Sequence, residues 1–345
     1  MTTTVEPQAP HSAAEQFALR QQSPLQRIQH VLHGHPFISP LLVLIVSVIA
    51  FTIINPRFIA PGTIGIILQQ VAVIAALAIG QTLVILTAGI DLSVGAIAIF
   101  ASLLMANFAV KNGMPGLLAL ILGIAAATLA GAVNGALVTR LNLPPFIVTL
   151  GTFSIFTALG LLYSGGQEVS RRQMPPILNW AGTRIDIGPF RLTTGVIIVA
   201  ILAVIMAFIL SQTSWGRHVY AVGDDAEASR LVGIRVDRVL FSVYTVAGLI
   251  YGITGWVQIG RSGTASPNAI VDANLDSITA VVIGGTSLFG GRGTIVGTIL
   301  GALIVGVFRI GLSLAGVDDQ WRLFATGLLV ILAVSIDQWI RKVKA

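Results

Sequence analysis

The feature that most constrains this chain is a series of long stretches without a charged residue. The first runs for 18 residues, from Phe37 to Ile54, and the second covers Phe58–Ile90. A helix rises about 1.5 Å per residue, so about 20 apolar residues cross the ~30 Å hydrocarbon core of a bilayer. Only 10% of the 345 residues are charged, against roughly 25% in average soluble domains. The sequence therefore predicts an all-α, polytopic membrane protein.

Eight further segments suggest about ten spans in total. Five are uncharged and long enough for one helix each: Leu92–Val110, Asn112–Thr139, Leu141–Gln167, Leu192–Gly216 and Val239–Gly260. The last three are less regular, because one is short and glycine-rich and the other two each contain a charge: Ser277–Gly291, Thr294–Gly316 and Leu323–Ile340.

The charged residues between the spans predict the organisation and orientation of the chain. Residues 1–36 form a polar tail without the apolar stretch of a signal peptide, 37–340 form the transmembrane domain, and 341–345 are a short basic end. With ten spans and a cytoplasmic tail, Lys and Arg are in excess on the cytoplasmic side, so both termini are predicted there. Loop 168–191 then faces the periplasm, and its prolines and Trp180 favour an ordered segment. Loop 217–238 faces the cytoplasm.

Several kinds of chemistry are excluded by missing residues. The chain has no cysteine, and it has no GxxxxGK[ST] motif for nucleotide phosphates. The glycines of Gly291–Gly297 have the wrong spacing for a dinucleotide site, and His218 has no partner at metal-ligand spacing. We therefore predict no catalytic residue, no metal and no bound cofactor. The net charge of +6 is interpreted as topological charge, not as a nucleic-acid interface.

Glycine is frequent, with 37 residues, and three pairs have the GxxxG spacing: Gly131 with Gly135, Gly248 with Gly252, and Gly297 with Gly301. Small residues at this spacing let membrane helices approach closely. Tight helix packing is the favoured interpretation, and a sliding or gating surface is the alternative.

Three polar residues stand within or between apolar segments. Asp91 follows Gly89 and is either a structural capping residue or part of a transport pathway. Asn134 either forms a hydrogen bond between helices or lines a pathway. The Arg309 side chain either extends to the membrane–water interface or pairs with an acid that the sequence does not identify.

The loop 217–238 is the densest concentration of charge in the chain. Within it, residues 224–233 predict a short helix, because acids at the start complement the helix dipole, Arg230 comes later and Gly233 stops the helix. Such an exposed helix can dock into a groove on another protein, and a merely solvated loop is the alternative.

This loop resembles that of permease subunits of bacterial ABC importers for simple sugars, of the ribose, xylose and galactose type. Glu227-Ala228-Ser229 followed by Gly233 is similar to the EAA-xxx-G loop that inserts a coupling helix into the ATPase, with Ser229 replacing the second alanine. Three other segments, in order, resemble the same family: Thr82–Gly95, Gly131–Leu150 and Leu275–Gly306. The resemblance covers about residues 40–340.

The resemblance implies an ABC importer permease fold and a homodimer with a pathway at its two-fold axis. It further implies an ABC ATPase partner, often tandem, that uses ATP and Mg²⁺, and a periplasmic or lipid-anchored sugar-binding protein. The permease, in the bacterial inner membrane, performs no covalent chemistry. The implied ATPase-coupling residues are Gly216, Arg217, Tyr220, Gly223, Glu227, Ala228, Ser229 and Gly233. The candidate pathway or gate residues are Asp91, Ser93, Gly95, Asn134, Phe146, Thr149, Gly285 and Thr286.

Two alternatives remain open at this point. A branched-chain amino acid ABC permease shares the pattern at Gly290-Gly291-Arg292-Gly293. A proton-coupled secondary transporter would use Asp91 as its proton site. The second alternative has no need of a docking helix in the cytoplasm.

Overall fold

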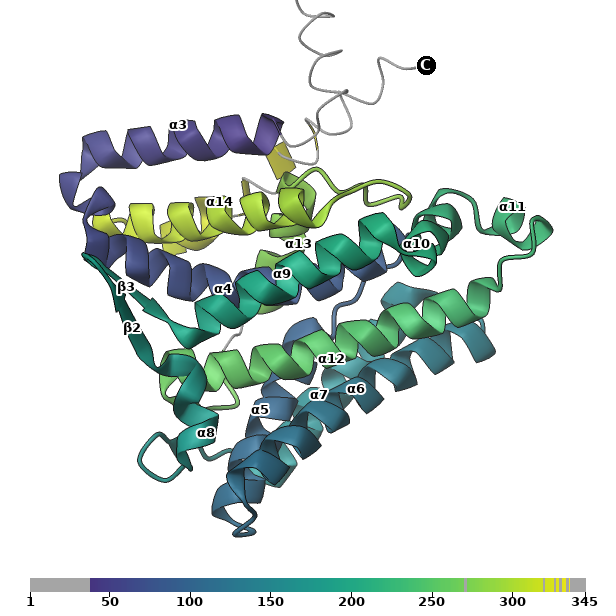
Figure 1. Ribbon diagram of the computed structural model, residues 1–345, viewed down its shortest axis with the longest axis horizontal. Helices are drawn as coiled ribbons and strands as arrows, with labels where there is room; N and C mark the ends of the chain where they lie inside the picture. Colours follow the sequence, from purple (N-terminus) through teal and green to yellow (C-terminus); the bar gives the residue numbers. More distant parts are fainter. Residues whose placement is uncertain are drawn as a thin grey trace, which may run out of the picture.

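The computed structural model describes residues 38–269, 272–318, 320–325, 327–328, 331–332 and 335. Its architecture is dominated by long apolar helices (Figure 1). Among the described residues, six helices are long and apolar enough to cross a membrane: α4 (Pro61–Leu86), α6 (Gly116–Arg140), α7 (Pro145–Ser164), α9 (Thr194–Gln212), α12 (Val236–Ser262) and α14 (Ile295–Leu314). The all-α, multi-pass membrane fold predicted from the sequence is confirmed.

Two shorter apolar helices match predicted spans one and three. They are α3 (Ile38–Ile54) and α5 (Val94–Val110), each of 17 residues. At 1.5 Å per residue each is about 26 Å long, which is close to the thickness of the hydrocarbon core.

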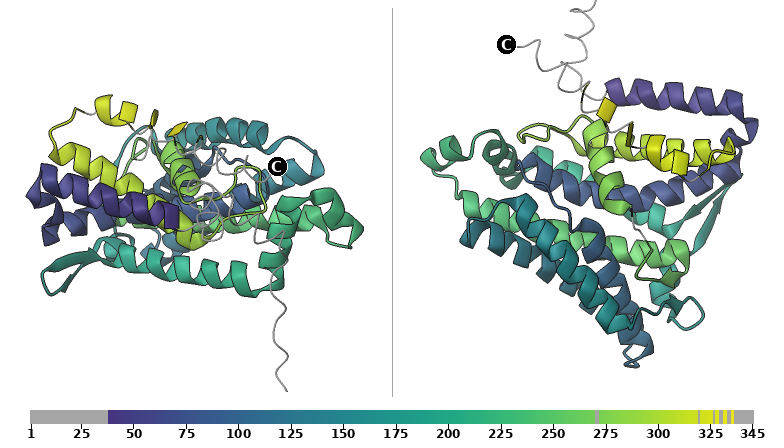
Figure 2. Two further views of the ribbon diagram at one scale, coloured as in Figure 1. Left: turned by 90° about the horizontal axis from the view of Figure 1, so that it is seen from above. Right: turned by 180° about the vertical axis from the view of Figure 1, so that it is seen from behind.

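The predicted eighth span differs in the structure. Ser277–Gly291 forms only the end of α13 (Ala273–Ile283), followed by a turn-rich segment. Eleven residues of helix measure about 16 Å, too short to cross a bilayer. Viewed from behind, α13 lies across α4 and α14 instead of beside them (Figure 2). The predicted tenth span, Leu323–Ile340, lies largely outside the described residues.

Helix α4 occupies the centre of the molecule. From Val71 to Leu86 every side chain is buried, and α4 packs against α9, α12, α13 and α14. A helix that is apolar on all sides can be surrounded by protein in this way. By contrast, α7 and α9 each leave large apolar side chains exposed, such as Leu162 and Val204, as expected of surfaces that face lipid.

Close contact between α6 and α12 depends on two of the predicted glycine pairs. A Cβ added to Gly248 would lie 2.5 Å from the carbonyl oxygen of Ala127 and 2.9 Å from Cα of Gly131. Only hydrogen fits at these positions, so the backbones touch directly. On α14, Gly297 and Gly301 approach the backbone of α13 in the same manner. The predicted tight packing is confirmed for all three pairs.

Residues 168–193 form an ordered layer at one end of the molecule, as the sequence predicted. Strand β1 (Val169–Ser170) pairs antiparallel with β4 (Thr264–Ala265). After β1 the chain continues with α8 (Pro176–Asn179) and with the hairpin of β2 (Arg184–Ile187) and β3 (Phe190–Thr193). We call this the hairpin end.

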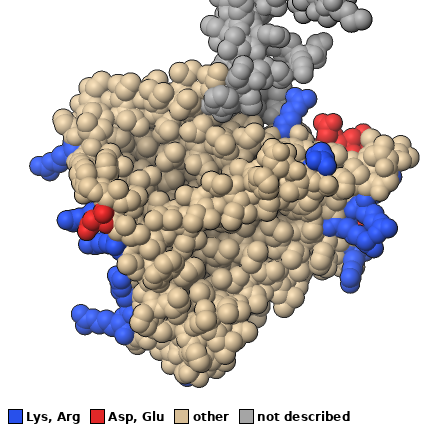
Figure 3. Space-filling view, in the orientation of Figure 1, with Lys and Arg blue, Asp and Glu red and all other residues tan. Residues whose placement is uncertain are grey.

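Charged side chains of the described residues gather at two ends of the molecule. In Figure 3 a broad surface without charge separates the hairpin end from the opposite end, which carries α10 (Ser214–Asp224) and α11 (Ala226–Leu231). We call the latter the α11 end. An uncharged belt between two charged ends is the surface that a bilayer requires.

Candidate functional site

Helix α11 is the short helix predicted in residues 224–233. The Asp225 side chain caps its start, because Oδ1 accepts hydrogen bonds from the backbone N–H of Glu227 (2.8 Å) and of Ala228 (2.9 Å). After Leu231 the chain turns through Gly233, whose φ of +90° suits a glycine. The prediction of a capped helix is therefore confirmed, with bounds Ala226–Leu231.

Helix α10, just before α11, was not anticipated. The uncharged stretch Leu192–Gly216 predicts one span and the charged residues after it predict a loop, but α9 ends at Gln212 and a new helix begins at Ser214. The hydroxyl of Thr213 caps α10 by accepting from the N–H of Gly216 (3.2 Å). The buried residues Val219 and Val222 lie on one face of this helix, a spacing that reveals it in retrospect.

Two residues of α10 join it firmly to the helical body. The Tyr220 hydroxyl donates a hydrogen bond to the carbonyl oxygen of Gly293 (2.8 Å). Burial raises the pKa of this hydroxyl above its ordinary value, so it remains a donor at neutral pH. Gly223 packs so closely on Leu86 that an added Cβ would collide with the Leu86 carbonyl oxygen. That oxygen accepts a hydrogen bond from the backbone N–H of Gly291 (3.0 Å). A shift of α10 must therefore displace the end of α4 and the segment before α14.

Helix α11 itself extends away from the body (Figure 1). Leu231 is 89% exposed and Val232 is 77% exposed, although both are apolar, whereas Ser229 is buried. Arg230 makes an exposed ion pair with Asp237 at 3.3 Å, a contact that contributes little to stability. The α11 end thus presents an apolar tip surrounded by charged groups.

The remaining coupling candidates lie at the same end. Gly216 packs against the carbonyl oxygen of Leu210, and the exposed Arg217 donates from Nη2 to the Ser214 hydroxyl (3.2 Å). Glu227 and Ala228 are exposed on α11. All eight candidates from Gly216 to Gly233 therefore lie at the α11 end, on α10, on α11 or in the turn that follows α11.

Three of the candidate pathway residues meet in a buried polar network at the break between α4 and α5. Asp91 Oδ1 accepts from the N–H of Ser93 (2.7 Å) and from its hydroxyl (2.6 Å), and Asn134 Nδ2 donates to the same hydroxyl (2.9 Å). All three side chains are buried. The carboxylate thus organises the turn that starts α5, and Asn134 connects that turn to α6.

The other pathway candidates are distributed more widely. Gly95 donates its N–H to Asn274 Oδ1 (2.9 Å), and the Thr149 hydroxyl donates to the carbonyl oxygen of Ile90 (3.0 Å), so both adjoin the network. Phe146 is exposed on the first turn of α7. Gly285 and Thr286 lie after α13, and Thr286 packs against Gly293. A pathway role for these residues remains a prediction.

The partners of Arg309 are two acids on or beside α13. Its Nη1 lies 3.1 Å from Asp276 Oδ2, and its Nη2 lies 3.5 Å from Asp272 Oδ2. Arg309 therefore pairs with acids, one of the two interpretations that the sequence left open.

Among the described residues no three His, Asp or Glu side chains come close enough together to hold a metal ion. The polar side chains described above instead cap helices, join helices by hydrogen bonds or form ion pairs.

The uncharged belt and the long apolar helices define a multi-pass membrane protein. Over residues 63–334 the chain matches the family described as branched-chain amino acid transport system / permease component. The chain belongs to this permease family.

Curated relatives are similar to the chain over most of its length. A fructose import permease, FrcC of Rhizobium meliloti, is 50% identical over 93% of this chain and 90% of its own. The ribose import permease RbsC of Bacillus subtilis is 39% identical over 87% of this chain and 92% of its own. A D-allose transport system permease, AlsC of Escherichia coli, is 34% identical over 87% of this chain and 91% of its own. No solved structure matches the chain.

Proposed function

We propose that this chain is the permease subunit of an ATP-driven ABC importer and forms the membrane path for a monosaccharide. The observation that carries the proposal is the α11 end, where a capped helix presents the exposed Leu231 and Val232 outside the uncharged belt. An apolar tip of this kind fits a groove on a partner protein.

The substrate class follows from the relatives. The family description names branched-chain amino acids, which is one of the alternatives raised by the sequence. Three similar proteins, however, are named for the import or transport of fructose, ribose and D-allose, and one of them shares half of its residues with this chain over 93% of the chain. A monosaccharide is therefore favoured over an amino acid.

An ABC ATPase, tandem in related systems, is the proposed partner at the α11 end. It would bind ATP and Mg²⁺ and perform the hydrolysis, while this chain, which has no phosphate-binding motif, performs no covalent chemistry. Movement of α11 would reach α10 and then the end of α4, through the contacts of Gly223 with Leu86. This route connects ATP hydrolysis to the membrane helices.

The remaining parts of the assembly follow from the family resemblance. Two copies of the chain would form the pathway between them, in the bacterial inner membrane, with both termini in the cytoplasm. A periplasmic or lipid-anchored sugar-binding protein would deliver sugar to the hairpin end, where Arg184, Arg191 and Asp186 are exposed.

Reconstitution tests this proposal directly. The chain is placed in liposomes with its partner ATPase and sugar-binding protein, and uptake of labelled fructose, ribose, D-allose and L-leucine is measured with and without ATP. We expect ATP-dependent uptake of a sugar and none of leucine. Uptake without the ATPase, or of leucine alone, would show that the proposal is wrong.

A substitution at Glu227 separates coupling from folding. The exposed Glu227 carboxylate makes no ion pair among the described residues, so Glu227→Ala should change the unfolding free energy by only about 0.5 kcal/mol. We expect ATP-dependent uptake to fall about tenfold or more, as for loss of a charged contact at an interface. The matched control is Asp318→Ala, an exposed acid beyond the end of α14, which should transport like the wild type. Equal uptake by both variants would remove Glu227 from the coupling contact.

A further inference from the structure

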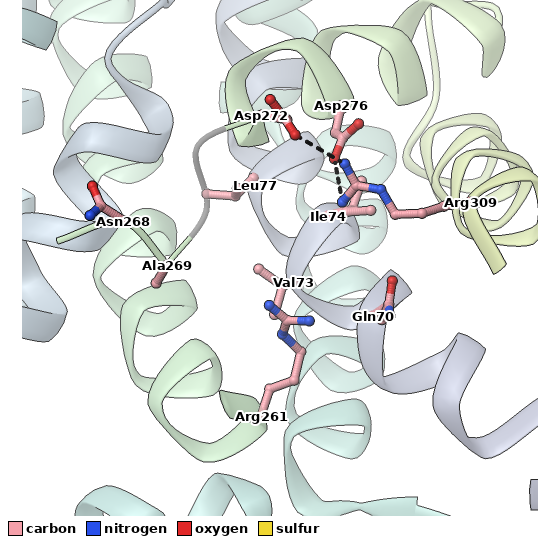
Figure 4. A pocket seen from close by; sticks show the side chains of 10 residues that line it. All are labelled: Gln70, Val73, Ile74, Leu77, Arg261, Asn268, Ala269, Asp272, Asp276 and Arg309. Carbon is pink, nitrogen blue, oxygen red and sulfur yellow. Dashed lines mark ion pairs between the residues drawn. The ribbon is translucent and has the colours of Figure 1, made fainter. Parts of the chain in front are cut away.

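A polar cavity of about 280 Å³ lies between α4, α12, α13 and α14 (Figure 4). Its position is well away from the α11 end, because Arg261 in its wall belongs to the last turn of α12, which leads to β4 at the hairpin end. The lining residues of the cavity are Gln70, Val73, Ile74, Leu77, Arg261, Asn268, Ala269, Asp272, Asp276 and Arg309.

One side of the cavity is formed by Arg309 and its two acids. Asp276 has a side chain that is only 4% exposed and lies 3.1 Å from Arg309, so this pair is fixed. The side chain of Asp272 is 47% exposed, and its contact with Arg309 is longer, at 3.5 Å. The Asp272 carboxylate therefore retains the capacity to accept hydrogen bonds from a ligand.

Arg261 enters the cavity from the opposite side (Figure 4). Its Nε donates to Gln258 Oε1 (3.0 Å), an interaction that orients the guanidinium group. No carboxylate pairs with Arg261 among the described residues, and the nearby charge of Arg309 repels it. Its two terminal nitrogens are thus available as donors in a partly enclosed site.

The remaining walls add neutral polar groups and an apolar face. Gln70 and Asn268 contribute amide side chains that make no hydrogen bond with other described residues. Val73, Ile74 and Leu77 lie on successive turns of α4 and contribute aliphatic surface. The cavity therefore combines donors, acceptors and an apolar wall in one space.

The charges of the lining residues cancel, because Arg261 and Arg309 are balanced by Asp272 and Asp276. Such a site gives an anion or a cation no net attraction. A monosaccharide fits these features, since it is neutral, carries donors and acceptors around its ring and has an apolar C–H face. The volume lies just below the roughly 300–1,000 Å³ common for small-molecule pockets, which suits a single small ligand.

We propose that this cavity binds one monosaccharide before the sugar enters the path between the two copies of the chain, with Arg261 donating to sugar hydroxyl groups and Asp272 accepting from them. This inference rests on the proposed function and adds to it a location and a set of contacts. It places a specificity-determining site in the permease itself.

The absence of cysteine from the chain makes a direct test possible. Ala269→Cys introduces a single thiol in the cavity wall, and Asp186→Cys introduces one at the exposed hairpin as a control. The full-length variants are placed in lipid nanodiscs, where both faces are accessible, and the rate of thiol modification by a methanethiosulfonate reagent is measured against increasing D-fructose, D-ribose or L-leucine. We expect a sugar to slow the reaction at Ala269→Cys only.

Adding a second substitution assigns the contact. Arg261→Gln in the Ala269→Cys background should raise the sugar concentration for half-protection about tenfold, because hydrogen bonds from a charged donor are lost. Arg184→Gln, an exposed arginine of β2 outside the cavity, should leave that concentration unchanged.

The outcomes separate this inference from the proposed function. If the reconstituted wild-type complex imports a sugar but that same sugar does not protect Ala269→Cys, or Arg261→Gln has no effect on protection, the inference is wrong and the proposed function stands. Protection by leucine in place of sugar also overturns the inference. If the complex imports no monosaccharide, the proposed function is wrong and the inference falls with it.

Discussion

Asp91 illustrates how a single carboxylate is accommodated in an apolar interior. A charged side chain at the centre of a bilayer costs about 2.5–3.5 kcal/mol on insertion scales. Here the carboxylate is buried within the protein, where it accepts two hydrogen bonds from Ser93. Tyr244 and Tyr251 lie close enough to interact with it as well. The burial cost is therefore offset locally, by donors that belong to the same turn.

We predict that Asp91→Asn retains part of the uptake activity. The amide oxygen of asparagine still accepts from the Ser93 N–H, so the turn before α5 is preserved. Asp91→Leu removes the acceptor and should lower the unfolding free energy by about 1–3 kcal/mol. Uptake in proteoliposomes and thermal unfolding in detergent measure the two effects. Complete loss of uptake by a well-folded Asp91→Asn variant would support the proton-coupled alternative instead.

The partners of Arg309 could not be predicted from spacing. Within one helix, residues three or four apart are neighbours, but Asp272 and Asp276 belong to another segment and meet Arg309 only because α13 packs on α14. The same reason hid the cavity, whose charged residues come from three separate parts of the chain. Each charged residue was visible in the sequence, and their proximity was not.

At the scale of helices, the contact between α6 and α12 gives a sharp prediction. Gly248→Ala places a methyl group against the backbone of Ala127 and Gly131, so the helices must separate. We expect the unfolding free energy to fall by about 1–3 kcal/mol, as for other overpacked sites.

Gly151→Ala in α7 is the matched control for Gly248→Ala. Nothing lies within 4 Å of the added methyl group at Gly151, and alanine favours helix over glycine by about 1 kcal/mol. Thermal unfolding of both variants in the same detergent measures the difference. Equal melting temperatures would show that the α6–α12 contact is not tight in the membrane protein.

Helices were predictable where one signal was unambiguous. Uncharged stretches identified the long spans, and Asp225 with Gly233 identified α11, because caps depend on local residues. Helix α10 was missed, because Arg217, His218 and Asp224 resemble a solvated loop although Val219 and Val222 form a buried face. The limits of α13 were missed, because a glycine-rich uncharged segment fits a helix and a turn equally well.

For the whole molecule, the separation of charge into two ends predicts the orientation in the membrane. We expect the α11 end in the cytoplasm and the hairpin end outside. Leu231→Cys and Asp186→Cys place single thiols at these ends, both exposed. A membrane-impermeant thiol reagent added to intact cells should modify Asp186→Cys only, and opening the membrane should expose Leu231→Cys. The reverse pattern would invert the topology.

A cavity that selects a neutral solute also determines how the membrane voltage acts on transport. The electrical work of moving one elementary charge across 100 mV is about 2.3 kcal/mol. The membrane voltage would therefore favour or oppose the entry of a cation or an anion by this free energy. A neutral solute held by two positive and two negative side chains carries no net charge through the field. Transport through such a site is electrically silent, so a cell accumulates its substrate to the same extent whether its membrane is polarised or not.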